Sequence, residues 1–189
     1  MKTNGTKINT INNFQKLNIE TSKNEVFSLF PIYFHDGVSD PIGETTMNDT
    51  SIVFKINYGN NHILITGDIG IKASEYLVNK KRNELEDINI LQVPHHAATP
   101  TAIDEFFFTT HPDVALVPAF KDLWLNNDRT KNVHKILDDI NSQIYVSALD
   151  GNIYISLFPT KYTIQRQNDI LIVKIIYVIR IATLRYIKY

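Results

Sequence analysis

The chain of 189 residues contains no cysteine, which excludes disulfide bonds and metal sites built on thiolates. This absence is compatible with either side of a membrane, so it assigns no redox compartment. An excess of one charge is also lacking, because 19 basic and 20 acidic residues give a formal net charge of −1. No overall basic field therefore draws the chain to nucleic acid, although local basic patches are compatible with this balance.

Long uncharged apolar runs are missing as well, and no stretch has the length needed to span a bilayer. The nearest is the carboxyl-terminal segment 161–189, which is interrupted by Lys174, Arg180, Arg185 and Lys188. The amino terminus carries a charge but no apolar core, so we expect no cleaved signal peptide. The compartment stays unknown on these grounds, with the cytoplasm as the default assignment.

The hydrophobic content of 43% is enough for one domain with a real core. Residues 1–24 predict an amino-terminal helix of low propensity or a flexible lead-in, because apolar side chains recur every third residue. Residues 25–160 carry the patterned segments of the domain. Residues 161–189 form an apolar and basic tail, whose β-branched residues favour strand over a helix lying on an apolar surface. We expect this tail to be covered by the fold or by a partner.

Within the domain, strand-like and helix-like segments alternate, which predicts an α/β fold, or α+β in some schemes. Strands are expected at 26–34, 88–93 and 113–117, and a hairpin joins 51–56 to 62–66 around 58–61. A second, closing hairpin is expected from 143–148 and 152–157. Helices are expected at 71–85, after a capping box at 101–104, and around 133–140, with polar loops at 35–47 and 124–128.

Two of these strands end on residue types that bind metals. Thr-Gly-Asp at 66–68 closes one apolar run, and Pro-His-His at 94–96 closes the next. A strand–helix–strand crossover makes the strands parallel, so Asp68, His95 and His96 leave the sheet at the same edge. Neighbouring strands lie about 4.8 Å apart, so a carboxylate and an imidazole there could share zinc, manganese or iron. This set falls short of a complete catalytic centre.

Each of these residues also has a structural explanation. Gly-Asp after a strand is often only a turn and a helix cap, and a His pair after proline is often only a loop. His35 and Asp36 lie in an expected loop, where surface polarity is the simpler interpretation and a further ligand role is the alternative. His62 is expected to pair across the first hairpin. His111 is expected to end a helix, and His134 to lie on a solvated helix face.

Taken in order, five motifs resemble the metallo-β-lactamase-fold domain of competence proteins of the ComEC type, and are similar to related stand-alone metallo-hydrolases. They are Asn-Asp-Thr-Ser at 48–51, Tyr-Gly at 58–59, Thr-Gly-Asp at 66–68, Pro-His-His at 94–96 and Asp-Gly at 150–151. The resemblance covers roughly residues 25–157. It implies an αββα sandwich with a mixed sheet and flanking helices.

For the site, the resemblance implies that Asp68 bridges zinc or manganese ions and that His96, rather than His95, supplies a terminal ligand. Both would take part in hydrolysis by a metal-activated hydroxide. Residues 48–51 would support the ligands from behind. The substrate expected from this family is a phosphodiester of DNA.

Departures from the family pattern change what is expected of this chain. The His-x-His-x-Asp-His motif is absent, since no His-x-His occurs in the sequence. Ala97-Ala98 replaces the usual Gly-Ser, and Asp128-Arg129 replaces a His-Pro. The chain therefore resembles the carboxyl half of the domain, a partial sandwich with an apolar face left for the tail or a partner to cover.

Two functions follow from this comparison. The first is a metal-dependent hydrolase-like domain that is weakly active or inactive alone, with a partner chain supplying the missing amino-terminal half. The alternative is a non-catalytic interaction module of a DNA-uptake or related assembly, with DNA or another protein as its partner.

Overall fold

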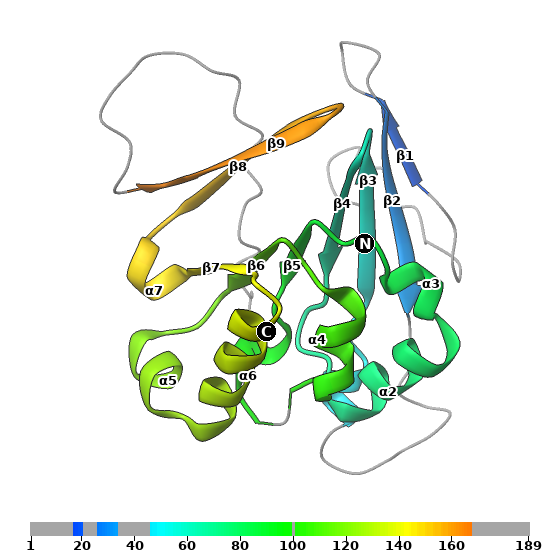
Figure 1. Ribbon diagram of the computed structural model, residues 1–189. Coiled ribbons are helices and arrows are strands. Elements are labelled where there is room, and N and C mark those ends of the chain that lie inside the picture. Colours follow the sequence, from blue (N-terminus) through cyan, green and yellow to red (C-terminus); the bar gives the residue numbers. More distant parts are fainter. Residues whose placement is uncertain (1–16, 21–25, 34–45, 100, 168–189) are drawn as a thin grey trace, which may run out of the picture.

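The computed structural model describes residues 17–20, 26–33, 46–99 and 101–167, which form a seven-stranded sheet, a helical layer and a two-stranded ribbon (Figure 1). The strands of the sheet lie in chain order, and neighbours are antiparallel from β1 to β4 and parallel from β4 to β7. The mixed α/β architecture with flanking helices is the one that the sequence predicts. The strands are β1 Leu17–Glu20, β2 Val26–Tyr33, β3 Val53–Tyr58, β4 Asn61–Ile65, β5 Ile90–Gln92, β6 Val114–Val117 and β7 Gln143–Val146.

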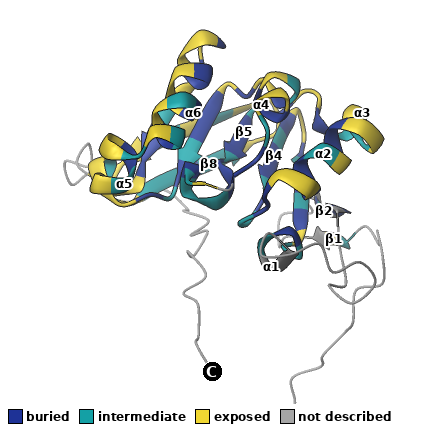
Figure 2. Ribbon diagram, turned by 90° about the horizontal axis from the view of Figure 1, so that it is seen from below, coloured by how far each residue is buried: buried dark blue, intermediate teal, exposed yellow. Residues whose placement is uncertain are grey.

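Helices cover one face of the sheet (Figure 2). Their buried side chains form the main core with the strand residues that face them, including Leu64, Leu91 and Ala115. None of the helices in the described part of the chain has the length and hydropathy of a membrane-spanning segment. The helices are α1 Thr46–Asp49, α2 Ile71–Lys80, α3 Arg82–Leu85, α4 Asp104–Thr110, α5 Lys121–Asn126, α6 Asp128–Asp139 and α7 Ser147–Asp150.

A ribbon of β8 Ile153–Phe158 and β9 Lys161–Arg166 packs on the opposite face of the sheet. Successive strand residues point to opposite faces, so Ile63, Ile90 and Val114 meet the ribbon while their neighbours in sequence enter the helical core. Burial on both faces explains why β4 to β6 read as continuous apolar runs rather than as an alternation.

The first hairpin and the crossover agree with the sequence-based expectation. β3 and β4 pair in antiparallel register, and His62 lies opposite Asn57 with a 2.6 Å contact between its Nδ1 and the amide oxygen. β4 and β5 are parallel neighbours joined through α2 and α3. The Thr66 hydroxyl donates to the Gln92 carbonyl at 2.8 Å, which ties the carboxyl ends of these two strands together.

The prediction of a closing hairpin from residues 143–148 and 152–157 is wrong. β7 instead joins the main sheet beside β6, in parallel register, and β8 pairs with β9. The cause is α7, in which Asp150 accepts a hydrogen bond from the Val146 amide at 2.7 Å and turns the chain away from the sheet. Residues 161–166, assigned to the tail on composition, are therefore part of the ribbon. The expected strand or helix at 170–181 lies outside the described residues.

Smaller expectations also need correction. The amino-terminal helix does not extend to Leu17, which begins β1, and residues 1–16 lie outside the described part. The expected polar loop at 124–128 is largely occupied by α5 and the start of α6. The Thr101 hydroxyl donates to the Pro94 carbonyl rather than capping α4.

Candidate functional site

Asp68 and His96 meet at the carboxyl edge of the sheet, as the topology predicts. Asp68 follows β4, and His96 follows the neighbouring parallel strand β5. The Asp68 Oδ1 atom lies 3.7 Å from the His96 Nε2 atom. The two side chains are 27% and 45% exposed, so the pair is accessible from solvent.

The imidazole of His96 is held by its other nitrogen. Its Nδ1 atom lies 2.6 Å from the carbonyl oxygen of Pro118, which follows β6. A carbonyl can only accept, so the hydrogen is on Nδ1 and the lone pair of a neutral ring is on Nε2, the nitrogen nearer Asp68. This anchoring of one ring nitrogen by a backbone carbonyl is the usual arrangement of metal-binding histidines.

The backbone of the Pro-His-His-Ala segment is strained. His95, His96 and Ala97 have φ values of 45°, 57° and 62°, all in the left-handed region. Each such residue costs roughly 1–2 kcal/mol, so three in succession store about 3–6 kcal/mol. The segment is held by hydrogen bonds from the His95 amide to the Gly67 carbonyl at 3.3 Å and from the Ala98 amide to the His95 carbonyl at 2.8 Å. Strain of this kind concentrates at functional sites.

The segment 48–51 supports the turn that carries Asp68. The Asp68 amide donates to the Ser51 hydroxyl at 3.2 Å. The buried carboxylate of Asp49 accepts from the Gly70 and Ala73 amides at 2.9 and 3.0 Å, and so fixes the first turn of α2. Gly70 offers no side-chain cap of its own, so this helix start depends on a carboxylate distant in sequence.

His95 does not join the pair. Its Nε2 atom contacts the Asn48 amide nitrogen at 3.3 Å, which places the nitrogen that a metal would need against a hydrogen-bond donor. Of the three ligands predicted from the sequence, the structure therefore brings together Asp68 and His96. The left-handed backbone at 95–97 sends adjacent imidazoles in different directions, with ring planes inclined at 49°.

The pair fits half of a metal site but not a whole one. Tetrahedral zinc with bonds of about 2.0–2.1 Å separates neighbouring ligand atoms by about 3.3–3.4 Å. The observed 3.7 Å is a few tenths of an ångström wider. Among the described residues, however, no group of three or more metal-binding side chains comes together. A catalytic zinc needs about three protein ligands, so a complete catalytic centre is not formed by these residues. His35 and Asp36 lie outside the described residues.

Arg129, at the position where the motif resemblance leads one to expect proline after histidine, makes contacts with neighbouring elements. Its guanidinium donates to the Asp104 carboxylate and to the Ala102 carbonyl, both at 2.5 Å. These bonds tie α6 to the first residue of α4 and to the loop before it. Arg129 thus makes a packing contact at this position.

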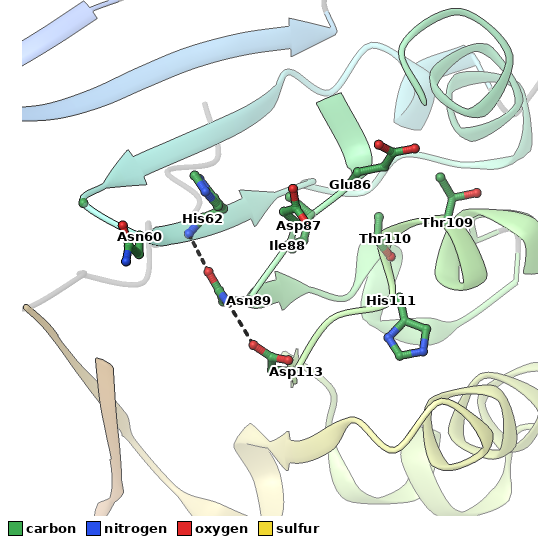
Figure 3. Close-up of a pocket in the computed structure, with 11 residues that line it drawn as sticks. Asn60, His62, Glu86, Asp87, Ile88, Asn89, Thr109, Thr110, His111 and Asp113 are labelled. Atoms are coloured by element: carbon green, nitrogen blue, oxygen red, sulfur yellow. Dashed lines mark hydrogen bonds between the residues drawn. The ribbon is translucent and has the colours of Figure 1, made fainter. Parts of the chain in front are cut away.

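A second polar feature lies at the opposite edge of the sheet and was missed by sequence reasoning. It is a cleft of about 710 Å³ whose walls include His62, Asp87, His111 and Asp113 (Figure 3). The Asn89 side chain crosses it, accepting from the His62 amide at 2.8 Å and donating to Asp113 at 2.9 Å. No local pattern could have indicated this cleft, because its walls come from separate loops.

The remaining histidines have structural surroundings. Burial lowers the pKa of His62, and the nearby Lys55 ammonium lowers it further. His111 ends α4 in the left-handed conformation, as expected. His134 lies on the exposed face of α6, with its ring 4.8 Å from that of Trp124.

No protein-family profile matches the chain, and no curated protein matches it. Among solved structures it is similar to a protein of Parabacteroides distasonis provisionally named as a metal-dependent hydrolase, at 13% identity and a TM-score of 0.45. The similarity covers 75% of this chain and 58% of that protein, so the chain spans less than two thirds of its length. At this identity and TM-score, the likeness assigns no activity to the chain.

Proposed function

We propose that this chain is a hydrolase-like domain of the metallo-β-lactamase type that keeps two metal ligands, Asp68 and His96, and is weakly active or inactive alone. The observation that supports this most is the orientation of His96. Its Nδ1 is committed to the Pro118 carbonyl, and its Nε2 lies 3.7 Å from the Asp68 carboxylate. A neutral imidazole and a carboxylate at this spacing suit zinc or manganese.

We expect low activity because the chain supplies only two protein ligands to the metal. Two protein ligands leave most of the coordination sphere of a divalent ion to water, so retention of the metal should be weak. The strained loop and the support from residues 48–51 hold the two ligands in place, which is characteristic of a metal site. The motif resemblance gives a phosphodiester as the substrate class, with DNA the expected example.

A second candidate function is a non-catalytic interaction module, serving a DNA-uptake or related assembly. It is favoured by His95, whose Nε2 already accepts from Asn48 and so is not available to a metal. In this case the Asp68–His96 pair would be a remnant that orders the turns at the sheet edge.

Metal binding and phosphodiesterase activity of the purified full chain separate these functions. We expect calorimetry to detect weak binding of zinc or manganese, and desalting to strip most of it. We expect hydrolysis of bis(p-nitrophenyl) phosphate within about tenfold of the rate without protein. Asp68→Asn should weaken metal binding at least tenfold, whereas Asp122→Asn, an exposed acid in the first turn of α5, should leave it unchanged.

Two results would contradict the proposal. Stoichiometric metal that survives desalting, together with activity that Asp68→Asn abolishes, would show a complete centre. Metal binding that is absent, or identical in the wild type and Asp68→Asn, would remove the pair from metal chemistry and leave the interaction module.

A further inference from the structure

Buried threonine hydroxyls bind the backbone on both sides of His96. Each comes from a different part of the chain, and each donates to a carbonyl within residues 92–97. They are Thr66, Thr101 and Thr130, which donate to Gln92, Pro94 and Ala97 at 2.8, 2.9 and 3.3 Å. Because the three threonines are at most 2% exposed, a carbonyl that lost its hydroxyl partner would face an apolar side chain in place of a donor.

Two of these bonds bracket the left-handed residues 95–97. The Pro94 carbonyl belongs to the peptide plane that precedes His95, and the Ala97 carbonyl belongs to the plane that follows Ala97. A peptide unit is planar, so a hydrogen bond to its oxygen restrains the orientation of the whole plane. With a plane held at each end, the backbone between them has less freedom to leave its φ values of 45°, 57° and 62°. The bonds from Thr101 and Thr130 therefore oppose relaxation of the strained turn.

The two threonines belong to one rigid framework. The loop of residues 101–103 is tied to α2, because the Ser74 hydroxyl accepts from the Ile103 amide at 3.1 Å. The same loop is tied to α6, because the Arg129 guanidinium donates to the Ala102 carbonyl at 2.5 Å. Arg129 directly precedes Thr130, and α4 and α6 lie side by side against the sheet (Figure 1). The start of α6 thus braces one end of the turn through Thr130 and the other end through the 101–103 loop.

We infer that Thr101 and Thr130 are positioning residues, whose hydroxyls hold the left-handed turn that points the Nε2 atom of His96 at Asp68. If the turn relaxes, rotation of the backbone carries the ring away from the Pro118 carbonyl, which fixes the hydrogen on Nδ1. The hydrogen can then reside on Nε2, where it removes the lone pair that faces Asp68. The inference rests on the proposed function for the use made of His96, but the orientation of the ring can be tested without metal.

Thr110 supplies a matched control. It is 1% exposed, and its hydroxyl donates to the Phe106 carbonyl at 3.0 Å within α4. Thr110→Val therefore removes a buried threonine hydroxyl that binds a carbonyl, as Thr101→Val does, but away from the turn. A loss of stability alone should affect both variants, whereas a change at His96 should occur only when the turn is released.

Nitrogen-15 NMR of the His96 ring in the full chain tests the inference. Spectra are recorded in EDTA at a pH of about 9, where imidazole groups are neutral. In the wild type we expect the hydrogen on Nδ1, with two well-separated ring-nitrogen shifts. Thr101→Val should raise the fraction of the Nε2–H tautomer about tenfold, as expected for the loss of one buried hydrogen bond, and so draw the two shifts together.

The other variants refine this comparison. Thr130→Val should act in the same direction but less strongly, because its hydroxyl also lies 3.3 Å from the Asn127 side-chain oxygen. Thr101→Ser and Thr130→Ser keep the donor and should restore the wild-type shifts. Thr110→Val should leave the His96 shifts unchanged. If Thr101→Val does not fold, Thr130→Val with its serine partner carries the same test.

Three results would overturn the inference. The first is a His96 spectrum that is the same in the wild type and in both valine variants at the turn. The second is an equal change in Thr110→Val, and the third is a change that the serine variants do not reverse. Zinc titration of the same proteins keeps the proposed function separate. A tautomer that responds to Thr101→Val in a chain that binds no zinc supports this inference and removes the proposed function. Zinc bound through Asp68, with a tautomer that does not respond, has the opposite meaning.

Discussion

Removing the carboxylate of Asp49 should destabilise the fold and loosen the turn that carries Asp68. Asp49 is 6% exposed and lies at the end of α1, yet its Oδ1 atom accepts from Gly70 and Ala73 at the start of α2. It therefore caps a helix that begins some twenty residues later in the chain. Asp49→Ala leaves two amides of the first helical turn without this acceptor.

The magnitude follows from these contacts. Hydrogen bonds to a charged acceptor contribute about 1.5–3 kcal/mol each, and loss of a cap alone costs about 1 kcal/mol. Because two bonds share one oxygen, we expect Asp49→Ala to lower the free energy of unfolding by about 2–4 kcal/mol. Asp49→Asn keeps an acceptor of the same shape but removes the charge that favours a helix amino terminus. Its cost should be about 1–2 kcal/mol.

Urea unfolding measures this difference, followed by the fluorescence of Trp124, the single tryptophan, which is 4% exposed. The control is Asp122→Ala, an exposed acid in the first turn of α5, which should cost less than about 0.5 kcal/mol. Asp49→Ala should also weaken zinc binding, because the residues that follow Asp68 lose their hydrogen bonds to the Asp49 carboxylate. If Asp49→Ala unfolds within about 0.5 kcal/mol of wild type with an equal m-value, the capping argument is refuted.

Two further predictions concern the rest of the molecule. Gly59→Ala should lower the free energy of unfolding by at least about 2 kcal/mol. Gly59 has left-handed backbone (φ +56°), and an added Cβ would clash with the carbonyl oxygen of Pro159. Gly67→Ala, with φ +59° but only a side chain nearby, should cost less in the same urea assay, and the reverse order would contradict this reasoning. Burial and Lys55 lower the pKa of His62 in the folded state below its unfolded value of about 6.5. The unfolded state therefore takes up this proton first, and stability falls as the pH drops through 6.5 towards the folded pKa. His62→Gln should lose less stability than wild type between pH 7.5 and 5.5, and equal losses would contradict the assignment.

Much of the fold could be predicted from the sequence because its strands are short apolar runs separated by helical patterns. The apolar runs that end at Ile65 and at Gln92 are buried on both faces of the sheet. Such runs can be recognised as strands from the sequence even when the pairing partner of each strand is unknown. The crossover rule then fixed their relative direction, and with it the meeting of Asp68 and His96.

The strand pairing of the carboxyl-terminal part was predicted wrongly, because a local sequence pattern does not identify the strand with which a segment pairs. β7 and β8 are adjacent apolar segments around Asp150 and Gly151, which fits a hairpin as well as it fits two different sheets. Two features place β7 and β8 in different sheets. The Asp150 carboxylate accepts a hydrogen bond from the Val146 amide, and the ribbon covers an apolar face of the main sheet.

Within the site, the sequence by itself determined the residue types, their order and the sheet edge on which they lie, because these follow from strand direction alone. Only the tertiary structure decided which of them converge. Nothing in the residues at 95–97 predicts three left-handed conformations, since none is glycine. That backbone turns His96 towards Asp68 and His95 towards Asn48, so the ligand count is set by torsion angles that long-range contacts stabilise.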